Sequence, residues 1–262
     1  MKYKSIFISD LHLNTRFCKS DILAELLKTY QCDNLFLVGD ILDLYVKGIN
    51  LPKSQINVIR KILTKAKRGT NVVYILGNHD ASLDELLDFD IDIEGIKIVK
   101  EYVYVSNHKR ILLTHGHIAD LPIVSNLYVL GDTCYTILLH LNSIYNWFRN
   151  KLGFGYYSLS QQVKNIVKDA IKFIENYEEC IIKHTKSKKC NVSICGHIHQ
   201  AEIKMIDNIL YMNCGDFQES CTAIVEDYDG NFALLKCNEG EFLRVKMFDS
   251  KANKIIESHN IT

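Results

Sequence analysis

Five short apolar runs constrain the fold of this chain more than any other feature. Each has the length of a strand and is rich in Ile, Val, Leu or aromatic residues, a composition typical of strands buried on both faces. The runs are Ile6–Ile8, Leu35–Val38, Val72–Leu76, Ile111–Leu113 and Val192–Ile194. Helix-like segments over Asp21–Tyr30 and Ser54–Lys67 separate the first three runs. Alternating strands and helices predict an α/β fold with parallel strands.

A second strand-rich region is expected after Ile96. Short alternating runs with polar connectors extend from there to Thr114, and the segment from Ile203 to Lys236 has the same character. Such runs are typical of hairpins, and we expect them to form a second sheet. The tail from Asp249 to Thr262 is polar and is expected to be poorly ordered.

A long helical insertion is predicted between these two parts, over residues 121–190, within a single domain that covers residues 1–262. The insertion contains nine Lys and Arg against five Asp and Glu, so its net charge is +4 in a chain whose formal net charge is zero. It also contains an apolar stretch around Leu138, Trp147 and Phe148. A solvated helical face and a lid that contacts acyl chains are both consistent with this pattern.

Residues that commonly bind metals follow each of the five apolar runs. Open α/β sheets bind their ligands at the carboxyl ends of the strands, so we expect these side chains to converge. The candidate metal ligands are Asp10, His12, Asp40, Asn78, His115, His197 and His199. Their mixed oxygen and nitrogen donors suit Mn, Fe, Zn or Co better than Ca or Mg. Seven ligands exceed the needs of one ion, so we expect two divalent ions, with manganese favoured.

These blocks, taken together, resemble the calcineurin-like metallophosphoesterase superfamily. The resemblance runs in order from Asp10-x-His12 through Gly39-Asp40-x-x-Asp43, Gly77-Asn78-His79-Asp80 and His115 to Gly196-His197-x-His199. It implies a four-layer β-sandwich flanked by helices. It also implies that Asp10, His12 and His199 hold one ion, that Asn78, His115 and His197 hold the other, and that Asp40 bridges them.

A narrower resemblance links the chain to the UDP-2,3-diacylglucosamine hydrolase (diphosphatase) branch, which acts in lipid A biosynthesis in Gram-negative bacteria. Ile8–Leu13, Cys195–His199 and Asn213–Ala223 carry it, together with the insertion, where these enzymes have a lid. The implied reaction splits the diphosphate to UMP and 2,3-diacylglucosamine 1-phosphate. His79 stands where the best-known enzymes have Arg, and His117 stands where the branch favours Asp. Both differences keep a general phosphodiesterase or nucleotide pyrophosphohydrolase open as the alternative.

The expected catalytic residues are His79, Asp80 and Asn78. His79, oriented by Asp80, would protonate or stabilise the leaving oxygen, whereas Asp43 is expected to orient a histidine ligand or a strand end. Two interpretations of His117 stay open: it belongs to the site, or it is an ordinary histidine of the loop. The expected substrate-binding residues are His79, Lys164, Lys168 and His197, the two lysines meeting a diphosphate.

Charge and cysteine spacing bear on location and partners. A zero net charge gives no reason to expect nucleic acid. Nine scattered cysteines without a C-x-x-C pair indicate a reducing compartment, so we expect a cytoplasmic protein. Peripheral contact with the inner membrane would be favoured by a basic rim at Lys183, Lys186, Lys188 and Lys189. No protein partner is inferred. A metal-poor scaffold without catalysis is the remaining alternative, which the intact ligand set argues against.

Overall fold

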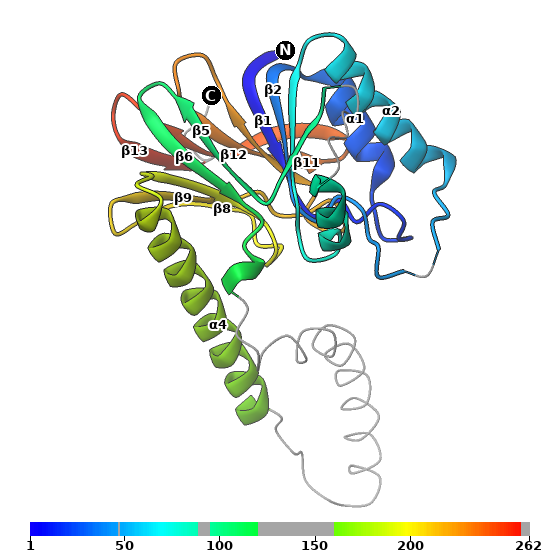
Figure 1. Cartoon of the computed structure of the whole chain (residues 1–262). Coiled ribbons are helices and arrows are strands. Elements are labelled where there is room, and N and C mark those ends of the chain that lie inside the picture. The colour runs from blue at the N-terminus through cyan, green and yellow to red at the C-terminus, as the bar shows by residue number, and fades with distance from the viewer. Residues whose placement is uncertain (47, 89–94, 120–159, 258–262) are drawn as a thin grey trace, which may run out of the picture. The chain divides into compact units, whose positions relative to one another are not determined.

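The computed structural model describes residues 1–46, 48–88, 95–119 and 160–257 (Figure 1). The chain divides into two compact units. One comprises Met1–His117 and Ile181–Thr262, and the other comprises Ile118–Cys180. Most of the predicted insertion, residues 120–159, lies outside the described residues. In the described part of the chain, no helix is long and apolar enough to cross a membrane.

The larger sheet has eight strands in the order β13-β12-β11-β10-β1-β2-β3-β4. Its parallel half consists of β1 (Lys2–Ile8), β2 (Gln31–Val38), β3 (Asn71–Ile75) and β4 (Lys97–Val99). Its antiparallel half consists of β10 (Thr222–Glu226), β11 (Phe232–Asn238), β12 (Glu241–Asp249) and β13 (Lys254–Glu257). The two halves join where β10 pairs with β1, with Ile6 opposite Val225.

The smaller sheet has five strands in the order β5-β6-β7-β9-β8. They are β5 (Glu101–Ser106), β6 (Lys109–Thr114), β7 (Val192–Cys195), β8 (Glu202–Ile206) and β9 (Ile209–Asn213). Strands β6, β7 and β9 are parallel, and β5 and β8 pair antiparallel at the two edges.

All five apolar runs form strands, and the α/β fold class is confirmed. Two details of the strand prediction were wrong. Strands β4, β10 and β11, expected in the second sheet, belong to the first. The polar tail was expected to be poorly ordered, but Lys254–Glu257 forms edge strand β13. Strands β10 and β4 join the first sheet by pairing with β1 and β3, partners about which local alternation carries no information. Strand β13 forms a hairpin with its neighbour β12.

Two apolar layers form the core of the larger unit. One lies between the sheets and includes Phe7 and Phe36, whose rings stack at 4.9 Å. The other lies on the opposite face of the eight-stranded sheet, where α1 (Ser20–Thr29) and α2 (Lys53–Lys67) cover it (Figure 1). Because side chains alternate along a strand, Phe7 enters one layer while Ile6 and Ile8 enter the other. Burial on both faces explains why β1 is continuously apolar.

The other described helices are short, with one exception. A 3-10 helix, η1 (Ala81–Asp88), follows the loop after β3, and η2 (His117–Ala119) follows β6. The long helix α4 (Ser160–Ser187) leads into β7, and its last turns, from Ile181 onward, belong to the larger unit.

Candidate metal centre

The polar side chains that follow the five strands meet in one place, although the strands belong to two sheets. Loops after β1, β2 and β3 of the larger sheet and after β6 and β7 of the smaller one carry them. Five of the seven expected ligands have a positive φ: Asp10 (53°), His12 (45°), Asp40 (52°), His197 (69°) and His199 (55°). Such backbone costs of order 1–3 kcal/mol per residue and is concentrated at functional sites.

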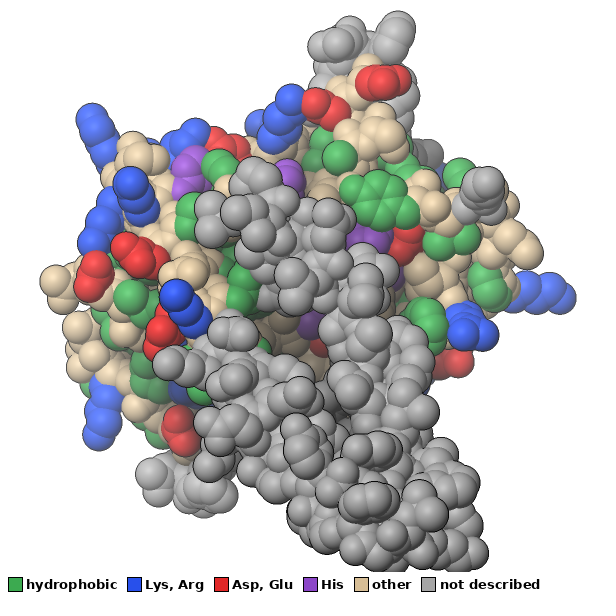
Figure 2. All heavy atoms as spheres, turned by 90° about the horizontal axis from the view of Figure 1, so that it is seen from below, with side chains coloured by type: hydrophobic (Ala, Val, Ile, Leu, Met, Phe, Trp, Pro, Cys, Tyr) green, Lys and Arg blue, Asp and Glu red, His purple; other side chains and the backbone are tan. Residues whose placement is uncertain are grey.

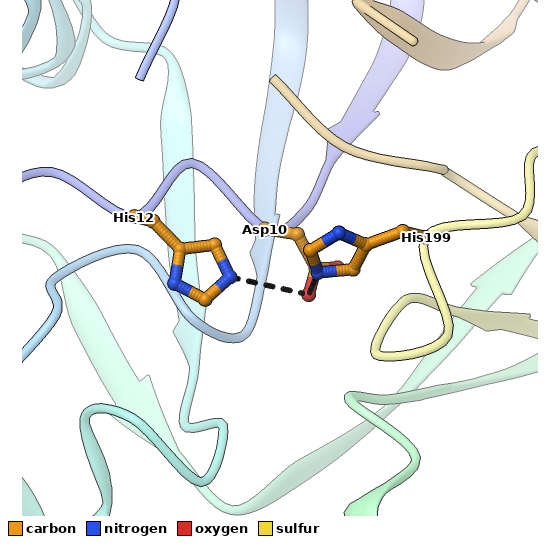
Figure 3. Close-up of side chains that lie close together, drawn as sticks. All are labelled: Asp10, His12 and His199. Carbon is orange, nitrogen blue, oxygen red and sulfur yellow. Dashed lines mark ion pairs between the residues drawn. The ribbon is translucent and has the colours of Figure 1, made fainter. Parts of the chain in front are cut away.

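The first ligand group is Asp10, His12 and His199, whose ligand atoms all lie within 4.8 Å of one another. His199 Nε2 lies 3.1 Å from Asp10 Oδ1, and His12 Nε2 lies 3.9 Å from the same oxygen (Figure 3). Asp10 comes from the loop after β1 and His199 from the loop after β7. The group therefore joins the two sheets.

The second ligand group is Asp40, His115 and His197, again within 4.8 Å. His115 is fully buried, and its Nδ1 lies 3.1 Å from the backbone oxygen of Val38, to which it can donate. That hydrogen bond leaves Nε2 to face the centre, where it lies 3.1 Å from Asn78 Oδ1. Anchoring one ring nitrogen on a carbonyl is the usual way to present the other to a metal.

Asp40 lies between the two groups. Its Oδ2 is 3.2 Å from His115 Nε2 in the second group and 3.8 Å from His12 Nε2 in the first. Its Oδ1 accepts a hydrogen bond of 2.8 Å from the backbone N–H of His79. Asp40 is thus placed where a bridging carboxylate would be needed.

The electrostatics of the centre reflect buried carboxylates and histidines at short range. Burial disfavours a charged imidazole, but Asp40 and Asp10 outweigh it and raise the pKa of His115 to about 9. Burial likewise opposes charge on His199, whereas Asp10 raises its pKa to about 9. For Asp40, burial opposes ionisation, but His115 and His79 hold its pKa well below the usual range. His12 differs, because its burial dominates and lowers its pKa.

Two glycines allow the backbone to pass close to the ligands. A Cβ at Gly77 would lie 2.2 Å from Asp40 Oδ1, and one at Gly196 would lie 2.3 Å from Asp10 Oδ2. Any side chain at either position would displace a carboxylate of the centre. The glycines in the Gly-Asn-His-Asp and Gly-His-x-His blocks therefore have a steric reason to be there.

The donor set fits divalent cations. Two buried atoms of the first group, Asp10 Oδ1 and His12 Nε2, have no hydrogen-bond partner in the described structure. Leaving a buried polar atom without a partner costs about 1–3 kcal/mol, and a cation coordinated by both atoms would remove that cost. Carboxylate and imidazole donors together are typical of transition-metal sites.

Asp43 connects the first ligand group to His79. Its Oδ2 lies 3.3 Å from His12 Nδ1 and 3.0 Å from His79 Nδ1. The Nε2 of His79 then points toward the centre, 3.9 Å from Asp40 Oδ2. The side chain of His79 is 27% exposed, so this ring is accessible to a substrate.

Asp80 does not orient His79, contrary to the expectation from the sequence. Its carboxylate is buried and accepts hydrogen bonds from the backbone N–H groups of Ile41 (2.8 Å) and Gly77 (2.5 Å) and from the hydroxyl of Tyr74 (2.7 Å). Burial raises its pKa. Asp80 therefore fixes the loops that carry Asp40 and Asn78, and Asp43 has the role that was assigned to Asp80.

Tyr45 is a neighbour of the centre that sequence reasoning missed. Its ring centroid lies 4.6 Å from that of His79, its backbone N–H donates to Asp43 Oδ1 at 3.1 Å, and its side chain is 68% exposed. No spacing rule could have located it, since its position depends on how the loop after β2 folds back. Histidine and hydrophobic side chains lie side by side on the face shown in Figure 2.

The remaining predicted residues lie outside these groups. His117 is exposed at the start of η2, with its ring 5.7 Å from that of His115. Lys164 and Lys168 fall on α4, but their side chains lie outside the described residues. In the predicted basic rim, Lys186 pairs with Asp207 at 3.1 Å, and Lys188 pairs with Glu101. Two of the four rim cations therefore already have carboxylate partners.

Comparison with protein families identifies the class. Residues 3–201, well over half of the chain, match the model of the calcineurin-like phosphoesterases. The chain belongs to this family. It is a metal-dependent phosphoester hydrolase with candidate metal-binding residues at the ends of five strands.

Comparisons with individual proteins add the following similarities. No curated protein matches the chain. Among solved structures, a variant of Vps29 from Entamoeba histolytica is 14% identical, with a TM-score of 0.48 and coverage of 94% of this chain and 99% of that one. A novel archaeal phosphodiesterase is 16% identical (TM-score 0.45; 89% and 99% covered). Yfce, a phosphoesterase from E. coli, is 15% identical (TM-score 0.47; 91% and 96% covered).

Proposed function

We propose that the protein hydrolyses a phosphoanhydride or phosphodiester bond at two divalent ions held on either side of Asp40. One observation carries this proposal: Asp40 Oδ2 lies within 3.8 Å of a histidine nitrogen from each ligand group. Asp10, His12 and His199 would hold one ion, and Asn78, His115 and His197 the other. When bound, such ions activate water and neutralise charge on the phosphoryl oxygens. Manganese is the proposed metal.

His79 would act on the leaving group. Hydrolysis adds water across the bond, so phosphorus gains the oxygen of water and the leaving oxygen must take up a proton. With Nδ1 donating to Asp43, a protonated His79 has its Nε2–H free to supply that proton. A positioned acid of this kind contributes about 10²–10⁴-fold to the rate.

Asn78 would contribute at the phosphoryl oxygens. Its Oδ1 faces His115 Nε2 at 3.1 Å, which leaves the amide Nδ2 to donate to a non-bridging oxygen. A donor aimed at developing negative charge stabilises the transition state more than the ground state. Asn78 thus serves both the metal and the substrate in this proposal.

The proposed substrate is UDP-2,3-diacylglucosamine, cleaved to UMP and 2,3-diacylglucosamine 1-phosphate in the cytoplasm as a step of lipid A biosynthesis. The resemblance of Ile8–Leu13 and Asn213–Ala223 to that branch supports it. Lys164 and Lys168 on α4 would meet the diphosphate, and the insertion would contact the acyl chains. Lys164→Ala should then raise KM without changing metal content.

General phosphodiester or nucleotide pyrophosphate hydrolysis is the second candidate. The observation that favours it is His79 itself, a partly exposed imidazole held by Asp43 at a position where the best-known lipid enzymes carry Arg. An imidazole that protonates the leaving oxygen suits many phosphodiesters. It makes no use of an acyl chain.

Product analysis with manganese-loaded protein separates the two candidates. The assay compares UDP-2,3-diacylglucosamine with a nucleotide sugar that lacks acyl chains and with a synthetic diester. UMP released only from the acylated substrate supports the lipid reaction, whereas comparable turnover of all three supports the general one. No hydrolysis of any of them, with both ions bound, would overturn both substrate assignments.

A further inference from the structure

The segment from Leu44 to Thr70 has an unusual charge composition for a chain with zero net charge. It contains seven Lys and Arg and no Asp or Glu. The segment comprises the later part of the loop after β2, which follows Asp43, and helix α2. One of its cations, Lys65, is buried and donates to the backbone oxygen of Tyr30 at 2.7 Å. The cations at the surface are the ones available to a partner.

Three of those cations form a stripe along α2. Lys53, Arg60 and Lys67 are exposed and lie seven residues apart, a spacing that places side chains on one face of a helix. Ile56, which is 37% exposed, lies on the same face between Lys53 and Arg60. The opposite face of α2 carries Val58 and Ile62 into the core. The exposed face therefore combines positive charge with an aliphatic side chain.

Large apolar side chains are exposed on the loops next to the start of this helix. Ile49 is 71% exposed, Tyr45 68%, Phe17 58% and Val46 44%. Large apolar side chains gathered on adjacent surface loops, rather than scattered singly, indicate an interaction site. The cation Arg16 lies beside them, 5.0 Å from the centre of the Phe17 ring.

Hydrogen bonds hold these loops and α2 together as one surface. Asn14 Nδ2 donates to the backbone oxygens of Asp43 (3.0 Å) and Gly48 (2.9 Å), and Asn14 Oδ1 accepts from the backbone N–H of Asn50. Gln55 in α2 accepts from the backbone N–H of Asn14 and donates to the backbone oxygen of Thr15 at 2.6 Å. The exposed apolar side chains are thus presented on a braced framework.

We propose that this surface, formed by Phe17, Tyr45, Val46, Ile49, Lys53, Ile56 and Arg60 and called here the basic-apolar surface, docks the protein on a bilayer that contains anionic phospholipid. Exposed aliphatic and aromatic side chains enter the region between headgroups and acyl chains, while cations beside them attract the headgroups. A nucleic acid would match the cations but offers nothing to Val46, Ile49 and Ile56. The proposal does not depend on which phosphoester the enzyme cleaves.

Docking there would bring the metal centre to the membrane surface. Tyr45 belongs to the basic-apolar surface, and its ring lies 4.6 Å from that of His79. This surface is distinct from the predicted basic rim at residues 183–189. It places the membrane contact on the loop after β2 and the helix that follows.

Vesicle flotation of the full chain tests the proposal without reference to activity. The probes are vesicles of phosphatidylcholine alone and vesicles with about 30 mol% phosphatidylglycerol, at about 0.15 M salt. We expect binding to the anionic vesicles only. Each surface cation contributes about fivefold to partitioning, so the double variant K53E/R60E should bind at least about 25-fold more weakly. Ile49→Gln should weaken binding several-fold at the same charge.

Matched control variants test whether membrane binding depends on the basic-apolar surface in particular. K236E/K254E changes the charge by the same amount at exposed lysines of β11 and β13, and Val105→Gln replaces an exposed apolar residue of β5. Both controls should bind like the wild type. Failure of the wild type to bind anionic vesicles, or equal losses in the controls, would overturn the proposal. So would tighter binding to single-stranded RNA or duplex DNA that Lys53 and Arg60 mediate, because the surface would then serve nucleic acid.

Discussion

The two ligand groups of the metal centre differ in how they are supported. In the second group, His115 is fully buried, and its Nδ1 lies within hydrogen-bond distance of the backbone oxygen of Val38. In the first group, His199 has a side chain that is 36% exposed, and His12 is held by a side chain, Asp43. One half of the centre is anchored on the main chain of a core strand. In the other half only His199 is partly exposed, and His12 depends on a carboxylate that it shares with His79.

This difference suggests that the two ions would have different roles. An ion in the second group would be held by His115, whose ring is fixed by the core. An ion in the first group would be coupled through Asp43 to the proton donor. Changes at the shared residues should therefore affect both groups, and changes at Asp43 should affect only the first group together with His79.

Replacing Asp40 should have the largest effect, because its carboxylate is common to both groups. Asp40→Ala is expected to abolish activity and to lower metal content at both positions together, measured by elemental analysis of the purified protein. Asp229→Ala, at an exposed carboxylate, is the control. Retention of one tightly bound ion with full occupancy would show that the groups are independent.

Replacing His79 should separate catalysis from metal binding. His79→Ala is expected to lower kcat by about 10²–10⁴-fold while both ions remain bound. The loss should be greatest for substrates with poor leaving groups, since these need the proton most. Turnover equal to that of the wild type would exclude His79 as the proton donor.

Replacing Asp43 should weaken metal binding in the first group and leave the second group unchanged. Asp43→Asn is expected to weaken binding of one ion by about 10–100-fold, through His12, and to lower kcat, through His79. Titration calorimetry of the metal-free protein measures the first effect. Asp229→Asn, at an exposed carboxylate, is the matched control and should leave both metal affinities unchanged. Equal weakening of both ions by Asp43→Asn would contradict the comparison.

The pH dependence of metal binding should be similar in the two groups. His115 and His199 each have a pKa of about 9 in the metal-free protein, so an ion must displace a proton from one histidine in either group below that pH. Affinity should therefore rise roughly tenfold per pH unit from about pH 6 toward pH 9 and then level off. An affinity independent of pH over that range would show that the histidines are already neutral.

The candidate ligands could be expected to lie together, because each follows a strand that is apolar on both faces. Strand ends are the places where such a chain can gather polar side chains, so Asp10, Asp40 and His115 could be expected to meet. A second sheet was expected, but the sheet that β10 joins could not be foreseen, since alternation defines the buried face of β10 and not its neighbour. Pairing with β1 is a long-range choice.

The role of Asp43 was harder to predict for a different reason. Asp80 follows His79 directly in the chain and was its expected partner, yet its side chain turns into the core to accept three hydrogen bonds. Asp43 is distant in sequence, and the loop after β2 brings it to His79. The positive charge of the Leu44–Thr70 segment does not appear in the net charge of the whole chain, which is zero because acidic segments elsewhere balance it.

The buried atoms Asp10 Oδ1 and His12 Nε2, which make no hydrogen bond, also have a consequence for folding thermodynamics. A cation that binds only the native chain stabilises it through mass action, by about 2.7 kcal/mol when its free concentration is a hundred times Kd. Chelation should therefore lower Tm as well as activity, and restored metal should raise both. The cellular supply of divalent metal would then govern how long each molecule survives proteolysis as well as how fast it works.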